Sequence, residues 1–232
     1  MNAKKPKHES RYLKTTLSDA QGFIFDMDGT ILNSHEAHYR AWDHVTKDYG
    51  FSYEKEDIVA QFGKTTAAIA TILCETDDLA TIQEISKAKE AYFIDEIPSI
   101  QLFEGVTNVF TALKRAGKRI CIASSNNNLA IEKIINQFQL EHLVDGFIGL
   151  DDIVRGKPDP EMIVKSAVKL DLDPGDCIVI GDSIYDIQAS IAARARCAIG
   201  VLTGTTATES LKNAGAIAVL QSVKELINHI KK

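Results

Sequence analysis

The sequence predicts an α/β protein whose parallel sheet is interrupted, after its first strand, by a helical insert. Three observations support this fold class. The apolar residues 23–25 end abruptly in acidic residues and a glycine, as a buried strand does at its carboxyl end. No clear strand pattern occurs between residues 35 and 100, where Ala, Ile, Glu, Lys and Gln are frequent. From Gly105 onward strand and helix patterns alternate, which is the sequence form of a parallel sheet covered by helices.

Length and composition are those of an ordinary globular chain. The 232 residues, 45% of them hydrophobic, suffice for one large core and a smaller satellite domain. The net charge of −6 argues against a nucleic-acid binder, which normally presents a basic face. No run of about 18 apolar residues predicts a membrane span. The cysteines have no spacing typical of zinc sites or disulfide frameworks, so we expect a reducing, cytoplasmic environment. They are Cys74, Cys121, Cys177 and Cys197.

The first 18 residues differ in charge from the rest of the chain. Their five basic residues and Glu9 give +4, which leaves −10 for the remainder because the whole chain carries −6. No apolar stretch of the signal-peptide type is present. We expect residues 1–18 to form a solvated, partly disordered extension, with contact to an acidic partner as the alternative. The core would then comprise residues 19–34 and 103–232, and a helical cap residues 35–102.

Four helical segments are predicted in the insert. The first has apolar residues every four positions and ends at Gly50. These positions are Ala37, Ala41, Val45 and Tyr49, with Trp42 beside them. The other segments are residues 54–62, 65–74 and 78–97. Gly63 separates the first two of these, and Pro98 follows the last.

The remainder of the core should alternate strands with helices. We expect strands where short apolar runs are bounded by turn residues, at 119–123, 146–149, 177–180 and 216–220. Helices are expected where apolar residues recur on one face, at 106–113, 131–138, 184–191 and 223–230. A further helix should start at Pro160, since proline suits the first helical position.

Polar residues follow three of the predicted strands at the point where each ends. They are Asp26, Asp28, Ser124, Ser125 and Asp182. Parallel strands bring their carboxyl ends to one edge of the sheet, where open α/β sheets bind ligands. Lys157, in the segment GKPDP, falls in a loop on the same side if the alternation holds. This set of acids, a lysine, hydroxyls and a helix N-terminus suits a phosphate ester.

Asp26 and Asp28 should reach one small volume, since side chains two apart in a strand point the same way. Close carboxylates repel, so either one takes up a proton or a cation such as Mg²⁺ neutralises the pair. One aspartate could attack phosphorus and form a phospho-aspartate, while the other moves the proton. Ser124 and helix N–H groups could hold phosphate oxygens, and Lys157 could face the developing negative charge.

The segments DMDGT, the strand ending in Ser124, GKPDP with Lys157, and GDSIYD resemble, in order, the four motifs of the haloacid dehalogenase-like superfamily. With the insert after the first motif, the chain is similar to the subfamily of phosphoglycolate phosphatase, sugar-phosphate phosphatases and β-phosphoglucomutase. This resemblance implies a Rossmann-like, three-layer core with a four-helix cap that moves as a lid. The hinges would fall near residues 32–34 and 99–105.

The same resemblance implies a role for each matching residue. Asp26 would be the nucleophile and a Mg²⁺ ligand, and Asp28 the acid and base, with its backbone carbonyl on the metal. Asp182 would be a further metal ligand. Ser124, Ser125 and Lys157 would bind phosphate, although Ser124 or Ser125 could simply cap the following helix.

Several weaker candidates remain beside these. Asp186 would lie near the metal, unless its role is only the capping box that Ser183 opens. Thr30 fits the phosphatases and would support the metal site. The segment HYRAW resembles β-phosphoglucomutase and related phosphatases and implies that His38 lies at the hinge. Lys64 and Asn126 could contact substrate, with a surface position as the alternative for Lys64.

The function expected from these residues is a Mg²⁺-dependent phosphoric monoester hydrolase acting on a small phosphorylated metabolite. A phosphomutase of the β-phosphoglucomutase type uses the same residues and is the first alternative. A binding protein that keeps the fold is the second. We expect no nucleic-acid or membrane partner, and a monomer or homodimer.

Overall fold

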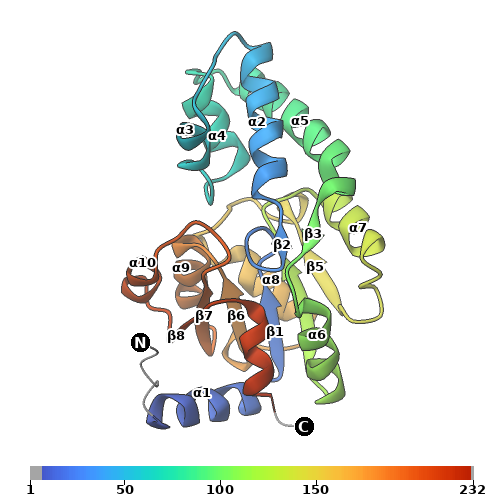
Figure 1. The fold of residues 1–232 in the computed structure, drawn as a ribbon, viewed down its shortest axis with the longest axis vertical. Helices are drawn as coiled ribbons and strands as arrows, with labels where there is room; N and C mark the ends of the chain where they lie inside the picture. Colours follow the sequence, from blue (N-terminus) through green and yellow to red (C-terminus); the bar gives the residue numbers. More distant parts are fainter. Residues whose placement is uncertain (1–6, 231–232) are drawn as a thin grey trace.

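A six-stranded parallel sheet forms the centre of the protein, which a computed structural model describes for residues 7–230 (Figure 1). In chain order its strands are β1 (Gly22–Phe25), β4 (Arg119–Ala123), β5 (Gly146–Ile148), β6 (Cys177–Gly181), β7 (Cys197–Val201) and β8 (Ala218–Leu220). Their order across the sheet is β5-β4-β1-β6-β7-β8, and all neighbours are parallel. The predicted α/β fold is confirmed.

Helices cover both faces of this sheet, because alternate residues of each strand point to opposite sides. Phe23 and Phe25 pack with α1 (Lys7–Asp19), α6 (Val106–Arg115), α7 (Asn128–Gln137) and the 3₁₀ helix η4 (Val223–Asn228). Ile24 packs on the other side with α8 (Glu161–Lys169) and α9 (Ile184–Ala192). The core is therefore a three-layer α/β structure, with β1 central in it.

A separate helical unit lies beyond the carboxyl edge of the sheet (Figure 1). It consists of α2 (His35–Asp48), α3 (Lys55–Val59), α4 (Thr66–Leu73) and α5 (Leu79–Glu96). Trp42, Ile58 and Ile85 belong to its own buried cluster. The chain enters and leaves the unit through β2 (Leu32–Asn33) and β3 (Gln101–Leu102), which pair antiparallel.

The N-terminal segment differs from the expected solvated, partly disordered extension, because Lys7–Asp19 form a helix. Helix α1 runs beneath the sheet (Figure 1), and Leu13 and Leu17 are buried in the main core. Burial of these two side chains stabilises the helix against the sheet, which the charge of the segment did not reveal. Residues 1–6 of the predicted extension lie outside the described residues.

Two elements near the C-terminus were not predicted. Strand β7 pairs with β6 and β8, and α10 (Thr208–Asn213) follows it. The apolar run of β7 comes directly after the segment ARAR, in which alanine and arginine alternate. These charged residues obscured the start of the strand in the sequence. The predicted closing helix is the 3₁₀ helix η4. No helix within residues 7–230 combines the length and apolar character needed to cross a bilayer.

Candidate active site

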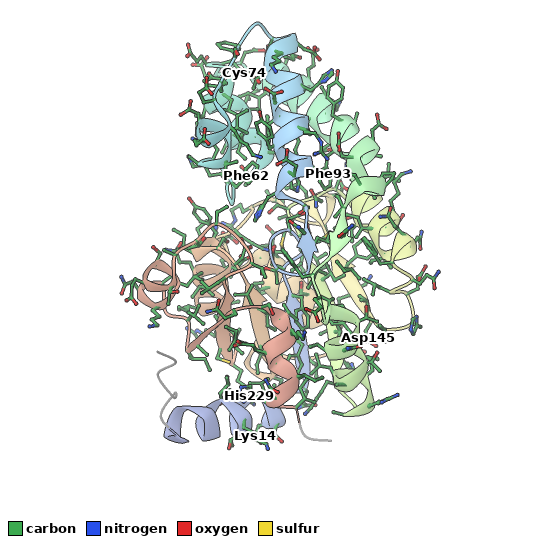
Figure 2. The ribbon with its side chains drawn as sticks, viewed as in Figure 1. Lys14, Phe62, Cys74, Phe93, Asp145 and His229 are labelled. Atoms are coloured by element: carbon green, nitrogen blue, oxygen red, sulfur yellow. The ribbon has the colours of Figure 1, made fainter. Side chains whose placement is uncertain are left out.

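A cavity of about 110 Å³ lies where the helical unit meets the carboxyl ends of β1 and β6. The core contributes acids, hydroxyls and one lysine to its lining: Asp26, Asp28, Ser125, Asn126, Lys157, Asp182, Ser183, Asp186, Thr205 and Thr206. The helical unit contributes His35, His38, Trp42, Phe62, Gly63, Lys64, Thr66, Ile69 and Lys89. Figure 2 shows Phe62 and Phe93 at the end of the unit nearest the sheet. The cavity is therefore enclosed jointly by both parts of the chain.

Three carboxylates form an acid cluster at the core side of this cavity. Asp26 directly follows β1, Asp182 follows β6, and Asp186 lies in the first turn of α9. One oxygen of each lies within 4.8 Å of the other two. A site made only of carboxylate oxygens suits a hard divalent cation such as Mg²⁺.

Lys157 joins two members of this cluster. Its Nζ donates to Asp26 Oδ1 and lies 2.7 Å from it, and the distance to Asp186 Oδ1 is also 2.7 Å. A third bond of 2.9 Å goes to the carbonyl of Ala123, at the end of β4. The lysine is only 8% exposed, so its three donors all have partners in the protein.

One lysine leaves the acid cluster short of positive charge. Burial raises the pKa of Asp26 to about 7. The Lys157 charge lowers this pKa, and the charges of Asp186 and Asp28 raise it. Burial and Asp26 raise the pKa of Asp182 well above its ordinary value. Burial alone would lower the pKa of Lys157, but Asp186 and Asp26 raise it. The donor set and its excess negative charge therefore fit a bound divalent metal.

The carboxylate of Asp28 has different partners and is not part of the acid cluster, and the expected contact of its backbone carbonyl with a metal stays a prediction. It accepts hydrogen bonds from Ser34 Oγ at 2.6 Å and Asn126 Nδ2 at 2.7 Å, and lies 3.0 Å from His38 Nε2. Although burial opposes it, His38 and Ser34 hold the pKa of Asp28 well below its usual range. The carboxylates of Asp26 and Asp28 have different partners because the strand ends at Phe25 and the chain turns at Gly29, whose φ is 76°.

Lys89 of α5 completes a buried chain of contacts to Asp28. Its Nζ lies 3.0 Å from His38 Nδ1 and 4.9 Å from the centre of the Phe93 ring. Burial and the Lys89 charge lower the pKa of His38 to about 4, and burial lowers that of Lys89 to about 8. A lysine ammonium has only donors, so neutral His38 must accept at Nδ1 and donate from Nε2 to Asp28. Helix α2 thus contacts Asp28 through His38, and helix α5 contacts His38 through Lys89.

Replacing Lys89 with Met should raise the pKa of His38 above about 4, because the neighbouring positive charge is removed while the ring stays buried. Since the ammonium is buried without a carboxylate partner at hydrogen-bond distance, the free energy of unfolding should stay the same or rise. NMR titration of the imidazole and thermal unfolding would measure both effects. Lys87→Met, on the exposed side of the same helix, is the matched control. An unchanged or lower histidine pKa would contradict the expectation.

The other sequence candidates lie in or beside the cavity. Ser125, Asn126 and Lys64 line it. Ser124 is fully buried, and its Oγ accepts a hydrogen bond of 3.1 Å from the Asn126 N–H. Thr30 Oγ1 donates to Asp182 Oδ1 at 3.3 Å and so orients that carboxylate.

Asp186 has two contacts of different kinds. Its Oδ2 accepts from the backbone N–H of Ser183 at 3.1 Å and completes the capping box of α9. Its Oδ1 faces Lys157. The capping and acid-cluster interpretations are therefore compatible.

Sequence reasoning did not single out Ser34, His35, Lys89, Thr66, Ser183, Thr205 or Thr206 as cavity or Asp28 contacts. No motif marks the helical-unit members, because the apolar pattern of a helix does not show which polar side chain faces a neighbouring domain. Ser34 could have been suspected from its place between the acid pair and the first insert helix.

Comparison with known proteins finds relatives of most of this chain. A sequence model of the family described as haloacid dehalogenase-like hydrolase matches residues 23–200. The fructose-1-phosphate phosphatase YqaB of Escherichia coli (strain K12) is 28% identical over 178 residues, which cover 74% of this chain and 92% of that protein. The β-phosphoglucomutase of Bacillus subtilis (strain 168) is 28% identical over 193 residues, covering 78% and 83%.

Two solved structures share the fold. A hydrolase from Pseudomonas syringae superimposes with a TM-score of 0.82 at 24% identity, over 90% of this chain and 97% of that one. CbbY from Rhodobacter sphaeroides in complex with phosphate gives a TM-score of 0.78 at 21% identity, over 91% and 99%. The likeness covers about nine-tenths of the chain in both cases.

Proposed function

The chain belongs to the haloacid dehalogenase-like hydrolase family, and we propose that it is a Mg²⁺-dependent phosphatase that acts on a small phosphate monoester through a phospho-aspartate on Asp26. The observation that carries this proposal is the placement of Asp26. Its carboxylate is held by Lys157, belongs to the acid cluster and faces the same cavity as Asp28. Nucleophile, cation site and proton carrier therefore meet in one place.

Asp26 would attack phosphorus with one carboxylate oxygen while the bond from phosphorus to the ester oxygen breaks. Asp28 would protonate that departing oxygen and then take a proton from the water that attacks the phospho-aspartate, so phosphate leaves and both acids are restored. Asp26, Asp182 and Asp186 would hold the Mg²⁺, which when bound reduces repulsion between the anionic nucleophile and the phosphate. Lys157 keeps Asp26 oriented and adds positive charge beside it.

Asp28 needs a proton for the first of these steps, and its surroundings indicate a source. His38 Nε2 lies 3.0 Å from Asp28 Oδ1 and would pass its proton to Asp28 as Nδ1 takes one from Lys89 Nζ, 3.0 Å away, and the proton that Asp28 takes from water would return along the same path. Both groups come from the helical unit. The proton supply of Asp28 would therefore depend on how that unit sits on the core.

The decisive experiment is release of inorganic phosphate from a panel of small phosphate esters, with phosphoglycolate and hexose phosphates first. We expect hydrolysis with Mg²⁺ and none after chelation of the metal. A protein that hydrolyses no ester of the panel, including p-nitrophenyl phosphate, would support the binding-protein alternative instead.

Mg²⁺ should stabilise the protein more at alkaline than at acidic pH. The pKa of Asp26 is 3.8 in an unperturbed chain and about 7 in the folded protein. The folded state then binds more protons between these values, so the free energy of unfolding of the metal-free protein falls as pH rises from about 4 to about 7. One fixed Mg²⁺ concentration, about 100 times the dissociation constant at pH about 8, should restore about 2.7 kcal/mol there and less at pH about 5, where protons compete for Asp26. Thermal unfolding with EDTA and with Mg²⁺, at pH about 5 and about 8, would measure this, and an equal metal effect at both would contradict it.

A phosphomutase is the second candidate, because the contacts of His38 and Lys89 link the acid/base residue to closure of the helical unit. An enzyme that passes the phosphoryl group to a sugar hydroxyl must exclude water at that moment. Incubation with β-glucose 1-phosphate and a bisphosphate primer separates the two activities. Formation of glucose 6-phosphate without net phosphate release would favour the mutase.

We also propose that residues 35–102 act as a cap that moves on the core formed by residues 19–34 and 103–232. The β2–β3 pair occupies both connections, which makes it the natural hinge. A cytoplasmic location is consistent with the four buried, unpaired cysteines of the described chain.

A further inference from the structure

Asp182 is held differently from the other two members of the acid cluster. Asp26 and Asp186 each lie 2.7 Å from Lys157 Nζ, whereas no ion pair within residues 7–230 includes Asp182. Lys157 therefore fixes the first two carboxylates and leaves the third without a charged partner. Other groups around Asp182 must set the orientation of its carboxylate.

The loop that follows β7 lies beside this aspartate. Strands β6 and β7 are parallel neighbours, with Gly181 in register with Gly200, so the residues after both strands leave the sheet at the same edge (Figure 1). The N–H of Leu202 donates to a carbonyl of β8 at 3.0 Å and so ties the start of the loop to the sheet. Residues 203–206 then pass next to Asp182, which directly follows β6.

Gly204 of this loop packs directly on Asp182. A Cβ added to Gly204 would lie 1.7 Å from Asp182 Oδ2, which is the shortest such distance for any glycine of the chain. It would also lie 2.4 Å from Cγ and 2.6 Å from Cβ of the same aspartate. Rotation of the aspartate side chain cannot relieve the last of these overlaps, because its Cβ is fixed to the backbone. Only glycine therefore allows the loop to approach Asp182 so closely.

The turn after β1 contacts the same carboxylate from a second segment of the chain. A Cβ added to Gly29 would lie 2.7 Å from Asp182 Oδ2, and Thr30 Oγ1 donates to Oδ1 at 3.3 Å. One oxygen of Asp182 thus lies close to both glycines, and the other accepts a hydrogen bond. Since the residue is only 7% exposed, its carboxylate has little room for another orientation.

Thr203 joins the two segments that contact Asp182. Its Oγ1 donates to the carbonyl of Gly29 at 2.6 Å, although the two residues are 174 positions apart in the sequence. The bond fixes the loop after β7 relative to the turn after β1. Neither Thr203 nor Gly204 lines the cavity, so neither is placed to touch a substrate.

We propose that Thr203 and Gly204 are positioning residues that hold the Asp182 carboxylate toward the acid cluster before Mg²⁺ binds. Thr203 ties the loop to the turn at Gly29, and Gly204 lets the loop close against the carboxylate. This inference rests on the proposed function, since it takes the acid cluster as the Mg²⁺ site. Contacts that orient a metal ligand typically contribute about 10- to 100-fold to metal affinity.

The test measures the dissociation constant of Mg²⁺ by calorimetry on the full chain without substrate. Gly204→Ala should weaken Mg²⁺ binding about 10- to 100-fold, because the added methyl group displaces Asp182. Thr203→Val keeps the shape of the side chain and removes its hydroxyl. It should weaken Mg²⁺ binding about 3- to 10-fold, as expected for the loss of one partly buried hydrogen bond.

Two controls separate positioning from a general loss of structure. Gly175→Ala makes the same change just before β6, at the opposite edge of the sheet, where the nearest atom would lie 4.0 Å from the new Cβ. Thr203→Ser keeps the hydroxyl donor. Both should bind Mg²⁺ as tightly as the unmodified protein. An unchanged dissociation constant in Gly204→Ala and Thr203→Val would overturn the inference and leave the phosphatase proposal intact.

The Thr203 pair decides the inference if Gly204→Ala does not fold. Weaker Mg²⁺ binding by Thr203→Val than by Thr203→Ser would then support it, and equal binding would overturn it.

If the unmodified protein binds no Mg²⁺, the cation of the proposed function fails, and crystal structures of Gly204→Ala and Thr203→Val decide the inference. A carboxylate of Asp182 that turns away from Thr30 in these variants would support it. A carboxylate that keeps its hydrogen bond to Thr30 in both variants would overturn it.

Discussion

Asp26→Asn should abolish phosphate release and leave the fold intact. The amide that replaces the carboxylate is not a nucleophile, and loss of the attacking group of a covalent mechanism costs about 10⁴-fold or more in kcat. The fold should persist because burial already raises the pKa of Asp26 to about 7, so the substitution removes a carboxylate whose charge is unfavourable there. Phosphate release and thermal unfolding, measured on the same preparation, would check both parts.

The covalent step can be examined directly. Acid-quenched protein should carry an alkali-labile phosphoryl group at Asp26 in the unmodified chain and none in Asp26→Asn. Asp77→Asn is the matched control, since Asp77 is exposed and lies in the loop before α5, outside the cavity. Turnover by Asp26→Asn at more than a small fraction of the normal rate would remove Asp26 as the nucleophile.

The core side of the site could be predicted because strands fix positions in space. Asp26, Asp182 and Lys157 follow elements whose pattern is legible in the sequence, and parallel pairing brings their ends together. The parallel α/β sheet followed from the same patterns. Residues that follow two paired strands can therefore be predicted to lie close together in the fold, even when they are far apart in the chain.

Beyond the first residues after a strand, the sequence pattern no longer predicts where a side chain lies. The turn at Gly29 directs Asp28 toward Ser34 and Asn126, and alternation could not reveal those partners. Lys64 and Lys89 are both lysines of the helical insert, yet one has a neutral amide partner and the other is buried against His38. Only the packing of the helices on the core distinguishes them.

Charge was a poor guide where apolar residues were few. The basic charge of the N-terminal segment predicts solvation, but Leu13 and Leu17 of α1 are buried in the core. A fully buried Leu side chain stabilises the docked helix by roughly 1.5–3 kcal/mol. A charge that stays in water on the opposite face of the helix opposes docking by less than this. The spacing of four between these leucines was the available signal.

Lys157→Met should destabilise the protein by about 3–5 kcal/mol, because it leaves Asp26 and Asp186 buried without their common partner. Activity should be lost together with stability. In metal-free buffer the loss should be smaller at pH about 5 than at pH about 8, since carboxyls that bind protons no longer need the lysine. Denaturant unfolding at both pH values would measure the effect. Lys212→Met is the control: its ion pair with Glu209 is on the surface, so the change should be within about 1 kcal/mol.

The origin of the Lys157 effect can be separated from a loss of packing by a double-mutant cycle. If unpaired carboxylates cause it, Asp186→Asn in the Lys157→Met background should recover about 1–3 kcal/mol, within the range of coupling between contacting residues. A cavity left by the lysine would not be filled by that second substitution, so packing predicts no recovery. Additive effects of the two substitutions would therefore show that the lysine supports the fold through its hydrocarbon stem. Recovery would show that the same charge pairing that orients the nucleophile also holds β1, the Lys157 loop and α9 together.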